Sequence, residues 1–425
     1  MLEDYEPTVE ISAEGMPQVR MWRGKPILRF QIACKPAGAQ CNLGCTYCYY
    51  LSKKELLDQE PGKIMSDEVL EEFIRQNINE QNFKRASFLW RGGEPTLCGI
   101  DFFKKVVAFQ KKHAPDEIKT ENEIQTNGTL LDEEWCSFLK ENNFRVILSI
   151  DGPSYIHDKF RTDSGGNGSL EKALKAAELL RKFDIRFSTY TYINRFSADY
   201  PVEIYRFLRD EVGSVLMNFI PVVELKDYET KSSACTSIEE MPPWDSNAAR
   251  PGNEDSVVTQ WSVDPDQWGS FLCSVFDEWY DNDIGKVNIF HFESIMYAAE
   301  GKKPPMCIFG PLCGKWMAVE ADGNVYSCER FVYPDYSIGN IMQAKLKEIL
   351  FSKEQHKFAY GKLRDLTSDC RDCRYLDWCY GECLKNRFIQ SPTGKPGHNY
   401  LCRGYKKFFS YTEERVRTIK NRQKS

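Results

Sequence analysis

Strands and helices alternate along the first half of this chain, and the alternation limits the possible folds more than any other feature. Six runs rich in β-branched and aromatic residues predict strands, separated by amphipathic helices. The strands are predicted at 27–34, 86–90, 121–126, 144–150, 185–193 and 214–223. Such units form right-handed βαβ crossovers and a parallel sheet. Six are too few for the usual eight-stranded barrel, so we predict an α/β fold with an open, partial (β/α)6 TIM-like barrel.

The loop after the first predicted strand carries three thiols, Cys41, Cys45 and Cys48, at a C-x3-C-x2-C spacing. Three thiolates can hold three irons of a cubane cluster, and the next cysteine, Cys98, is fifty residues further on. One iron would stay open for an outside ligand, which indicates a reactive cluster rather than an electron carrier. The alternative is a zinc knuckle, although no histidine lies near this loop to complete such a site.

A second set of cysteines lies in the C-terminal part of the chain. Its members are Cys307, Cys313, Cys328, Cys370, Cys373, Cys379, Cys383 and Cys402. Eight thiolates suffice for two fully ligated four-iron clusters, which would transfer electrons. Two zinc sites fit the same spacing, so the residues alone leave both metals open.

Charge and hydropathy exclude several classes of function. The net charge of −6 and the pI near 5.7 argue against nucleic acid as a partner, which needs basic patches. The first ten residues are acidic and contain no apolar run, so we expect no signal peptide. No apolar run approaches the roughly 20 residues of a membrane span. We therefore expect a cytoplasmic protein without a membrane partner, whose sixteen cysteines serve metals rather than disulfides.

The cysteine loop, with Tyr47 before its last thiol, resembles the signature of the radical S-adenosylmethionine (SAM) enzymes. In that family SAM chelates the open iron, and its reductive cleavage gives a 5′-deoxyadenosyl radical that removes a hydrogen atom from the substrate. The motif Gly92-Gly93-Glu94-Pro95 resembles the family's site for the SAM amino group, with Glu94 as acceptor. Ser149 and Arg161 match positions that hold the SAM carboxylate and ribose. Taken alone, the glycine motif is equally well an ordinary turn, and Arg161 alone would more readily be a surface arginine.

The C-terminal cysteines resemble the SPASM domain of radical SAM peptide-modifying enzymes, in which the ligands of two auxiliary clusters interleave. The resemblance implies that auxiliary cluster I uses Cys307, Cys313, Cys328 and Cys383. It implies that auxiliary cluster II uses Cys370, Cys373, Cys379 and Cys402. With the SAM cluster this makes three 4Fe-4S clusters, and it favours iron over zinc. Before Cys328, Asp322-Gly323 predicts the tip of a hairpin.

These patterns divide the chain into five segments. They are an N-terminal extension at 1–26, the radical SAM core at 27–224, an insertion at 225–262, a bridging helical segment at 263–300 and the SPASM domain at 301–425. Serine, proline and glycine interrupt any periodicity in the insertion. It is either a lid over the barrel mouth or a solvated loop without a role.

Motifs at 48–51, 124–131, 149–153 and 381–388 resemble the anaerobic sulfatase-maturating enzymes. Members of that family oxidise a Cys or Ser of a sulfatase to formylglycine, which implies a protein substrate and a flavodoxin- or ferredoxin-type reductant. One alternative is a maturase of ribosomally made peptides that forms thioether or carbon–carbon crosslinks or epimerises a residue. A protein that binds metal without catalysis is a third hypothesis.

One position departs from the family pattern. The family's catalytic base is an aspartate after a phenylalanine, about fourteen residues before the first auxiliary cysteine. Here Phe292-Glu293 stands fourteen residues before Cys307. Glutamate is a carboxylate and can serve as the base, but a displacement of about 1 Å can cost on the order of 100-fold in rate. Glu293 is therefore our candidate base, a sign of a different substrate, or a surface residue.

Overall fold

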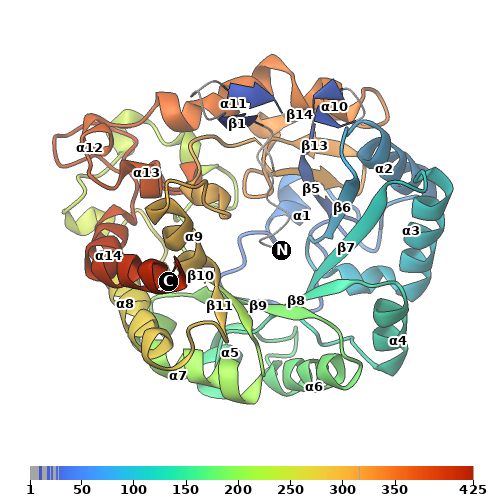
Figure 1. The fold of residues 1–425 in the computed structure, drawn as a ribbon, viewed down its shortest axis with the longest axis horizontal. Coiled ribbons are helices and arrows are strands. Elements are labelled where there is room, and N and C mark those ends of the chain that lie inside the picture. Colours follow the sequence, from blue (N-terminus) through green and yellow to red (C-terminus); the bar gives the residue numbers. More distant parts are fainter. Residues whose placement is uncertain are drawn as a thin grey trace.

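The computed structural model describes residues 9–11, 17–19, 21–22, 25–26, 28–314 and 316–424, with side chains over 28–234, 236–314 and 316–419. Its strands curve around the middle of the molecule, and the longer helices of the first half lie outside them (Figure 1). The C-terminal third closes the ring beside the first strands of the barrel (Figure 1). Most of the predicted N-terminal extension lies outside the described residues.

Fourteen strands are present in the described residues. They are β1 Val9–Ile11, β2 Pro17–Val19, β3 Met21–Trp22, β4 Lys25–Pro26, β5 Gln31–Lys35, β6 Arg85–Trp90, β7 Lys119–Thr126, β8 Arg145–Ser149, β9 Phe187–Ile193, β10 Leu216–Pro221, β11 Asn288–Ile289, β12 Trp316–Glu320, β13 Asn324–Tyr326 and β14 Ser337–Asn340. The first four form two separate antiparallel pairs, and the other ten form one sheet.

Fourteen α-helices accompany them in the same described ranges. They are α1 Lys53–Leu56, α2 Asp67–Asn79, α3 Ile100–His113, α4 Glu133–Glu141, α5 Ser154–Phe160, α6 Leu170–Lys182, α7 Pro201–Arg206, α8 Pro265–Asn282, α9 Phe290–Ala299, α10 Leu346–Leu350, α11 Lys353–Arg364, α12 Ser368–Arg371, α13 Leu376–Cys379 and α14 Cys402–Lys424. Each of them is too short or too polar to span a membrane.

The six strands β5 to β10 are parallel and lie side by side in chain order, which confirms the predicted partial barrel. Strand β11 extends this sheet in parallel beyond β10. At the other edge β12 pairs in parallel with β5, from Trp316 opposite Gln31 to Glu320 opposite Lys35. The predicted hairpin is present as β12 and β13, but the sequence did not predict that it joins the barrel sheet. The C-terminal domain is thereby anchored to the first barrel strand.

Aromatic side chains bind the sheet to its outer helices. Phe88 and Trp90, two residues apart on β6, point to one face because side chains alternate along a strand. The ring of Trp90 lies 6.0 Å from Phe73 of α2 and 5.7 Å from Phe103 of α3, centroid to centroid. All four are fully buried, so they form the apolar layer between the barrel and its helices.

Helix ends follow the sequence signals closely. The side chains of Ser66 and Asp132 cap α2 and α4 by accepting hydrogen bonds from the backbone, as their positions predict. One boundary differs from prediction. The first barrel strand begins at Gln31 rather than at residue 27, which is outside the described residues. Helix α7 ends at Arg206 and continues as a π-helical turn, Phe207–Glu211.

The insertion at 225–262 contains only short 3-10 turns within its described residues, which include every backbone position. It packs on the C-terminal domain rather than extending into solvent. Pro243 forms a bridge with Gln390, and the Ser233 hydroxyl donates to the Lys385 carbonyl at 2.5 Å.

Candidate active site

The three thiols of the cluster loop follow strand β5. Cys45 and Cys48 are electrostatic neighbours of Cys41, so the three lie together. The Cys41 sulfur accepts from the Leu43 amide at 3.4 Å and from the Asn127 side chain at 3.8 Å. These donors favour the thiolate, which is the metal-binding form. The loop therefore fits a site in which all three thiols bind one cluster.

Arg161 lies beside the cluster loop at the end of α5. Its Nη1 is 3.9 Å from the Cys45 sulfur, and its Nε donates to Oδ2 of Asp151 at 2.8 Å. Burial raises the pKa of the Cys45 thiol to about 11, and the Arg161 charge opposes this rise. The guanidinium is thus fixed between a carboxylate and a cluster thiol, which suits a group that positions a charged ligand.

Asp151 connects Arg161 with the aromatic part of the loop. The Tyr47 hydroxyl donates to its Oδ2, and the Tyr192 amide donates to its Oδ1 at 2.9 Å. The Tyr47 ring stacks on the Tyr192 ring at 5.7 Å. Sequence reasoning included Asp151 in a motif but gave it no role. Its position directly after strand β8, ten residues before Arg161, was the available signal.

His157 supports the hydrogen-bond network of Asp151 and Arg161. Its Nδ1 accepts a hydrogen bond from the Asp151 amide at 3.2 Å, and its Nε2 lies 3.0 Å from the Ser169 hydroxyl. Ser169 donates onward to the Arg161 carbonyl at 2.8 Å. Burial, with help from Arg161, lowers the pKa of His157 to about 4. The neutral ring therefore carries its proton on Nε2 and holds both Asp151 and Arg161 in place.

The Gly92-Gly93-Glu94 motif lies against the segment that leads into the cluster loop. The amides of Gly93 and Glu94 donate to the carbonyls of Gly38 and Gln40, both at 2.8 Å. A Cβ on Gly93 would come within 2.0 Å of the Gln40 carbonyl, so this close approach excludes any larger residue. Gly93 therefore makes room for the chain's own backbone at residues 38–40.

The Glu94 carboxylate is buried and already has several donors. Its Oε1 accepts from the hydroxyls of Thr96 and Thr126 at 2.6 and 2.8 Å, and its Oε2 accepts from the Asn127 amide at 2.8 Å. Burial raises the pKa of Glu94, and these hydrogen bonds oppose the rise. A carboxylate oxygen accepts about two hydrogen bonds, so Oε2 retains room for one more donor. Ser149, which is also buried, is the last residue of strand β8.

Glu293 occupies the first turn of α9 and is half-buried. Its neighbours His291 and Phe292 point into the core. Phe290, three residues earlier and on the same helix face as Glu293, contacts Tyr190 of β9 at 6.5 Å. That face therefore borders the barrel strands rather than the outer surface.

Four of the C-terminal thiols form one group, which we name thiol group I. Cys307 and Cys383 are electrostatic neighbours of both Cys313 and Cys328. The Arg330 guanidinium neighbours Cys383 and also Tyr49 of the cluster loop. The interleaved set implied for auxiliary cluster I is thus together in space.

The other four, thiol group II, line a single cavity. They are Cys370, Cys373, Cys379 and Cys402. Cys402 and Cys370 are electrostatic neighbours of Cys379, in keeping with this grouping. The cavity is otherwise walled mainly by Tyr375, Leu376, Tyr405 and Phe409. Four converging thiols in an aromatic enclosure fit a closed cluster with no open iron.

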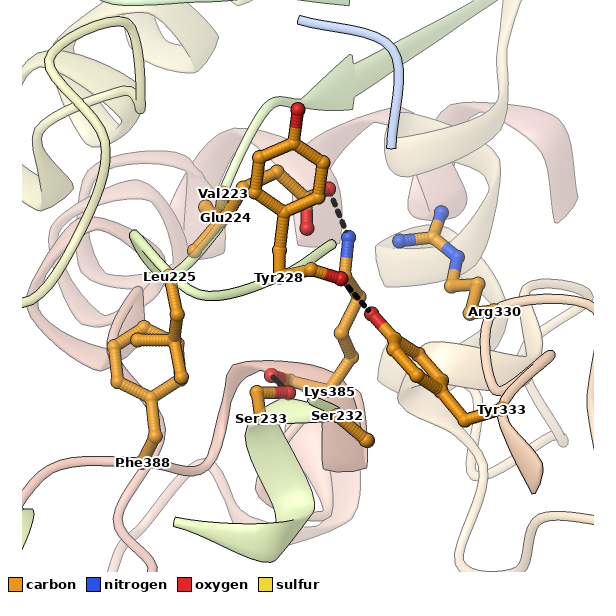
Figure 2. Close-up of a pocket in the computed structure, with 10 residues that line it drawn as sticks. All are labelled: Val223, Glu224, Leu225, Tyr228, Ser232, Ser233, Arg330, Tyr333, Lys385 and Phe388. Carbon is orange, nitrogen blue, oxygen red and sulfur yellow. Dashed lines mark hydrogen bonds and ion pairs between the residues drawn. The ribbon is translucent and has the colours of Figure 1, made fainter. Parts of the chain in front are cut away.

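A small polar pocket joins the barrel, the insertion and the C-terminal domain (Figure 2). In it Lys385 pairs with Glu224, and the Tyr333 hydroxyl donates to the Tyr228 carbonyl at 2.7 Å. Leu225 lies at the apolar side of the pocket, away from Arg330 and Tyr333 (Figure 2). The first contact joins the barrel to the C-terminal domain, and the second joins the insertion to the C-terminal domain.

Two family models match this chain. The radical SAM superfamily matches residues 36–208, and an iron-sulfur cluster-binding domain, SPASM, matches residues 311–374. The second match decides for iron over zinc in the C-terminal domain. The cofactors are therefore SAM, the 4Fe-4S cluster of the radical SAM core and additional iron–sulfur clusters in the SPASM domain.

The chain is 40% identical over 380 residues to a serine-type anaerobic sulfatase-maturating enzyme of Bacteroides thetaiotaomicron, covering 89% of this chain and 88% of the relative. It is 32% identical to a cysteine-type enzyme of Clostridium perfringens, covering 91% and 97%. A solved structure of native anSMEcpe with bound AdoMet and Kp18Cys peptide matches with a TM-score of 0.79 at 31% identity, covering 92% and 99%. SuiB of Streptococcus suis, with a TM-score of 0.56 at 15% identity, shares only the fold. This chain belongs to the anaerobic sulfatase-maturating enzymes, a family of radical SAM oxidoreductases with a SPASM domain.

Proposed function

We propose that this enzyme oxidises a cysteine or serine of a sulfatase polypeptide to formylglycine. The observation that carries the proposal is the 40% identity to a serine-type sulfatase-maturating enzyme along nine-tenths of the chain. The cysteine-type relative matches 91% of the chain at 32% identity, so both substrates are included. A flavodoxin- or ferredoxin-type protein is the proposed reductant, the cytoplasm the proposed location, and nucleic acid is not a partner.

In this proposal Cys41, Cys45 and Cys48 hold the SAM cluster. The other cofactor contacts are Tyr47, Gly92, Gly93, Glu94, Ser149 and Arg161. Arg161 would hold the SAM carboxylate, and Asp151 and His157 already fix its orientation. Glu94 would hold the SAM ammonium group at Oε2, the oxygen that has the fewer donors. Thiol groups I and II are the proposed ligand sets of the two auxiliary clusters.

The chain's contribution to the reaction is to hold the substrate and remove one proton. When bound, SAM would supply the radical that takes a Cβ hydrogen, and an auxiliary cluster would supply an acceptor for the second electron. Glu293 takes the proton of the thiol or hydroxyl group as general base. A serine then yields the aldehyde directly, whereas a cysteine yields a thioaldehyde that water converts to the aldehyde and hydrogen sulfide. The domain boundaries given above, and a role of the insertion as a lid over the barrel mouth, are also proposals.

The test is mass spectrometry after anaerobic reaction of the reconstituted enzyme with SAM, reductant and sulfatase-motif peptides carrying Cys or Ser. We expect the cysteine peptide to lose sulfur and to gain an aldehyde that a hydrazide traps. A crosslink would retain sulfur and would support the peptide-maturase alternative. An unchanged peptide beside steady 5′-deoxyadenosine formation would contradict the sulfatase substrate.

A further inference from the structure

Lys362, near the end of α11, is fully buried. Its ammonium group donates to the carbonyls of Cys307 and Ile308, at 3.0 and 2.6 Å. Its own carbonyl accepts from Arg387 at 2.6 Å, so the residue is held from both ends. Lys362 forms no ion pair with any carboxylate in the described part of the chain. A buried ammonium is costly unless opposite charge is near, so its compensation must come from elsewhere.

Several thiols lie close enough to this charge to compensate it when they are ionised. Lys362 is an electrostatic neighbour of three group I thiols, Cys307, Cys313 and Cys383. It is also an electrostatic neighbour of Cys379 of group II. Three of the four group I thiols are thus within its reach, against one of group II.

We propose that Lys362 is a positioning residue for the oxidation, acting through auxiliary cluster I by raising its reduction potential. A thiolate-ligated cluster becomes more negative when it accepts an electron, and net charge near the cluster sets its potential. A fixed cation stabilises the reduced state most where burial limits screening. The electron that leaves the substrate after Cβ hydrogen removal then meets a more favourable acceptor. This inference rests on the ligand sets proposed above.

The experiment replaces Lys362 by Met in the holoenzyme and follows a reductive titration by electron paramagnetic resonance. Signals that SAM leaves unchanged report the auxiliary clusters. We expect the reduction equilibrium of one auxiliary cluster to become at least tenfold less favourable, which for one electron lowers the potential by about 59 mV. Lys362→Arg, which keeps the charge, should restore most of the potential. An unchanged potential in Lys362→Met with full iron content would overturn the proposal.

Gln355 provides a matched control on the same helix. It is as buried as Lys362 and donates to two carbonyls beside group I, those of Gly314 and Ser327, at 3.0 and 3.1 Å. It carries no charge. Gln355→Met removes the same number of hydrogen bonds, so we expect less than a threefold change in the equilibrium. A shift equal to that of Lys362→Met would assign the effect to structure and overturn the proposal.

The auxiliary iron content of the variants distinguishes an effect of the charge from an effect on cluster assembly. If Lys362→Met and Lys362→Gln both lose auxiliary iron, we expect Lys362→Arg and Gln355→Met to keep it. Equal iron loss in Gln355→Met would contradict a role for the charge. Absence of auxiliary signals from the unaltered enzyme would instead remove the ligand sets of the proposed function, a failure distinct from an unmoved potential.

Discussion

The cluster loop and thiol group II present the same side chain, cysteine, in different surroundings. The loop offers three thiols beside polar groups, with Asn127 near Cys41 and Arg161 near Cys45. Group II offers four thiols in a cavity with aromatic walls, which include Tyr405 and Phe409. Polar neighbours can hold a charged ligand at an open iron, whereas an apolar wall protects a closed cluster from water. The number of thiols and the character of their neighbours together distinguish the two sites.

The sheet links the two parts of the molecule. Strand β5 leads into the cluster loop, and its parallel neighbour β12 begins the hairpin that leads to Cys328 of group I. Backbone hydrogen bonds between adjacent strands therefore fix the two ligand segments relative to one another. This rigid link suits electron transfer, which depends on a constant separation between centres.

The sharpest test of the comparison removes one thiol from each part. Cys41→Ala should abolish SAM cleavage, a loss on the order of 10⁴-fold or more, because the cluster that reduces SAM cannot form. Cys402→Ala should leave SAM cleavage largely intact while product formation falls. The assay measures 5′-deoxyadenosine and formylglycine in parallel.

Iron analysis is the control for both variants. The unaltered enzyme should hold about twelve irons per chain, and Cys402→Ala about eight. Abolished SAM cleavage in Cys402→Ala with the SAM cluster intact would contradict the expectation that SAM cleavage depends on the cluster loop and not on thiol group II. Zinc in place of most auxiliary iron would contradict the ligand sets.

A second, smaller effect concerns the proposed base. Glu293→Gln keeps size and hydrogen bonding but cannot take a proton, so product formation should fall by about 100-fold or more. SAM cleavage should persist, since Glu293 is on α9 and outside the cluster loop. Glu293→Asp is the matched variant, which keeps the charge and shortens the side chain by one methylene. Unchanged product formation by Glu293→Gln would remove it as the base.

Features of the fold and the site that depend on local residue patterns could be predicted from the sequence. Strand and helix periodicity gave the six barrel units, and the spacing of Cys41, Cys45 and Cys48 indicated an open cluster. The pairing of β5 with β12 could not be predicted, because it joins segments about 280 residues apart. Lys362 lies in a polar helical segment, so the sequence pattern alone indicates a surface residue. In the structure, tertiary packing buries it. The role of Asp151 likewise depends on Tyr47 and Arg161 meeting in space.

A third effect tests the polar side of the comparison. Asp151→Asn removes the charge that orients Arg161, and hydrogen bonds to charged groups are worth roughly 1.5–3 kcal/mol. We expect the dissociation constant of SAM to rise by about 10- to 100-fold. Tyr47→Phe removes a hydrogen bond to the same carboxylate but keeps the charge pair, so its effect should be smaller. Equilibrium dialysis with SAM measures both.

Iron content again serves as the control, because the Asp151 variants must retain the SAM cluster to be compared. Equal affinity in Asp151→Asn and the unaltered enzyme would mean that Arg161 does not depend on this carboxylate for its position. A larger loss in Tyr47→Phe than in Asp151→Asn would move the main role to the tyrosine.

The smallest effect is a pH dependence that comes from the buried His157, which is hydrogen-bonded to Asp151 and Ser169. Burial lowers its pKa in the folded state to about 4, whereas an exposed histidine has a pKa near 6.5. Between these values the unfolded chain binds a proton that the folded chain does not, so stability is lost as pH falls. From pH 7.5 to 5.5 this histidine should cost about 1 kcal/mol of unfolding free energy. Anaerobic urea unfolding should give a flatter pH profile for His157→Gln than for the unaltered enzyme, and identical slopes would contradict the buried, neutral state.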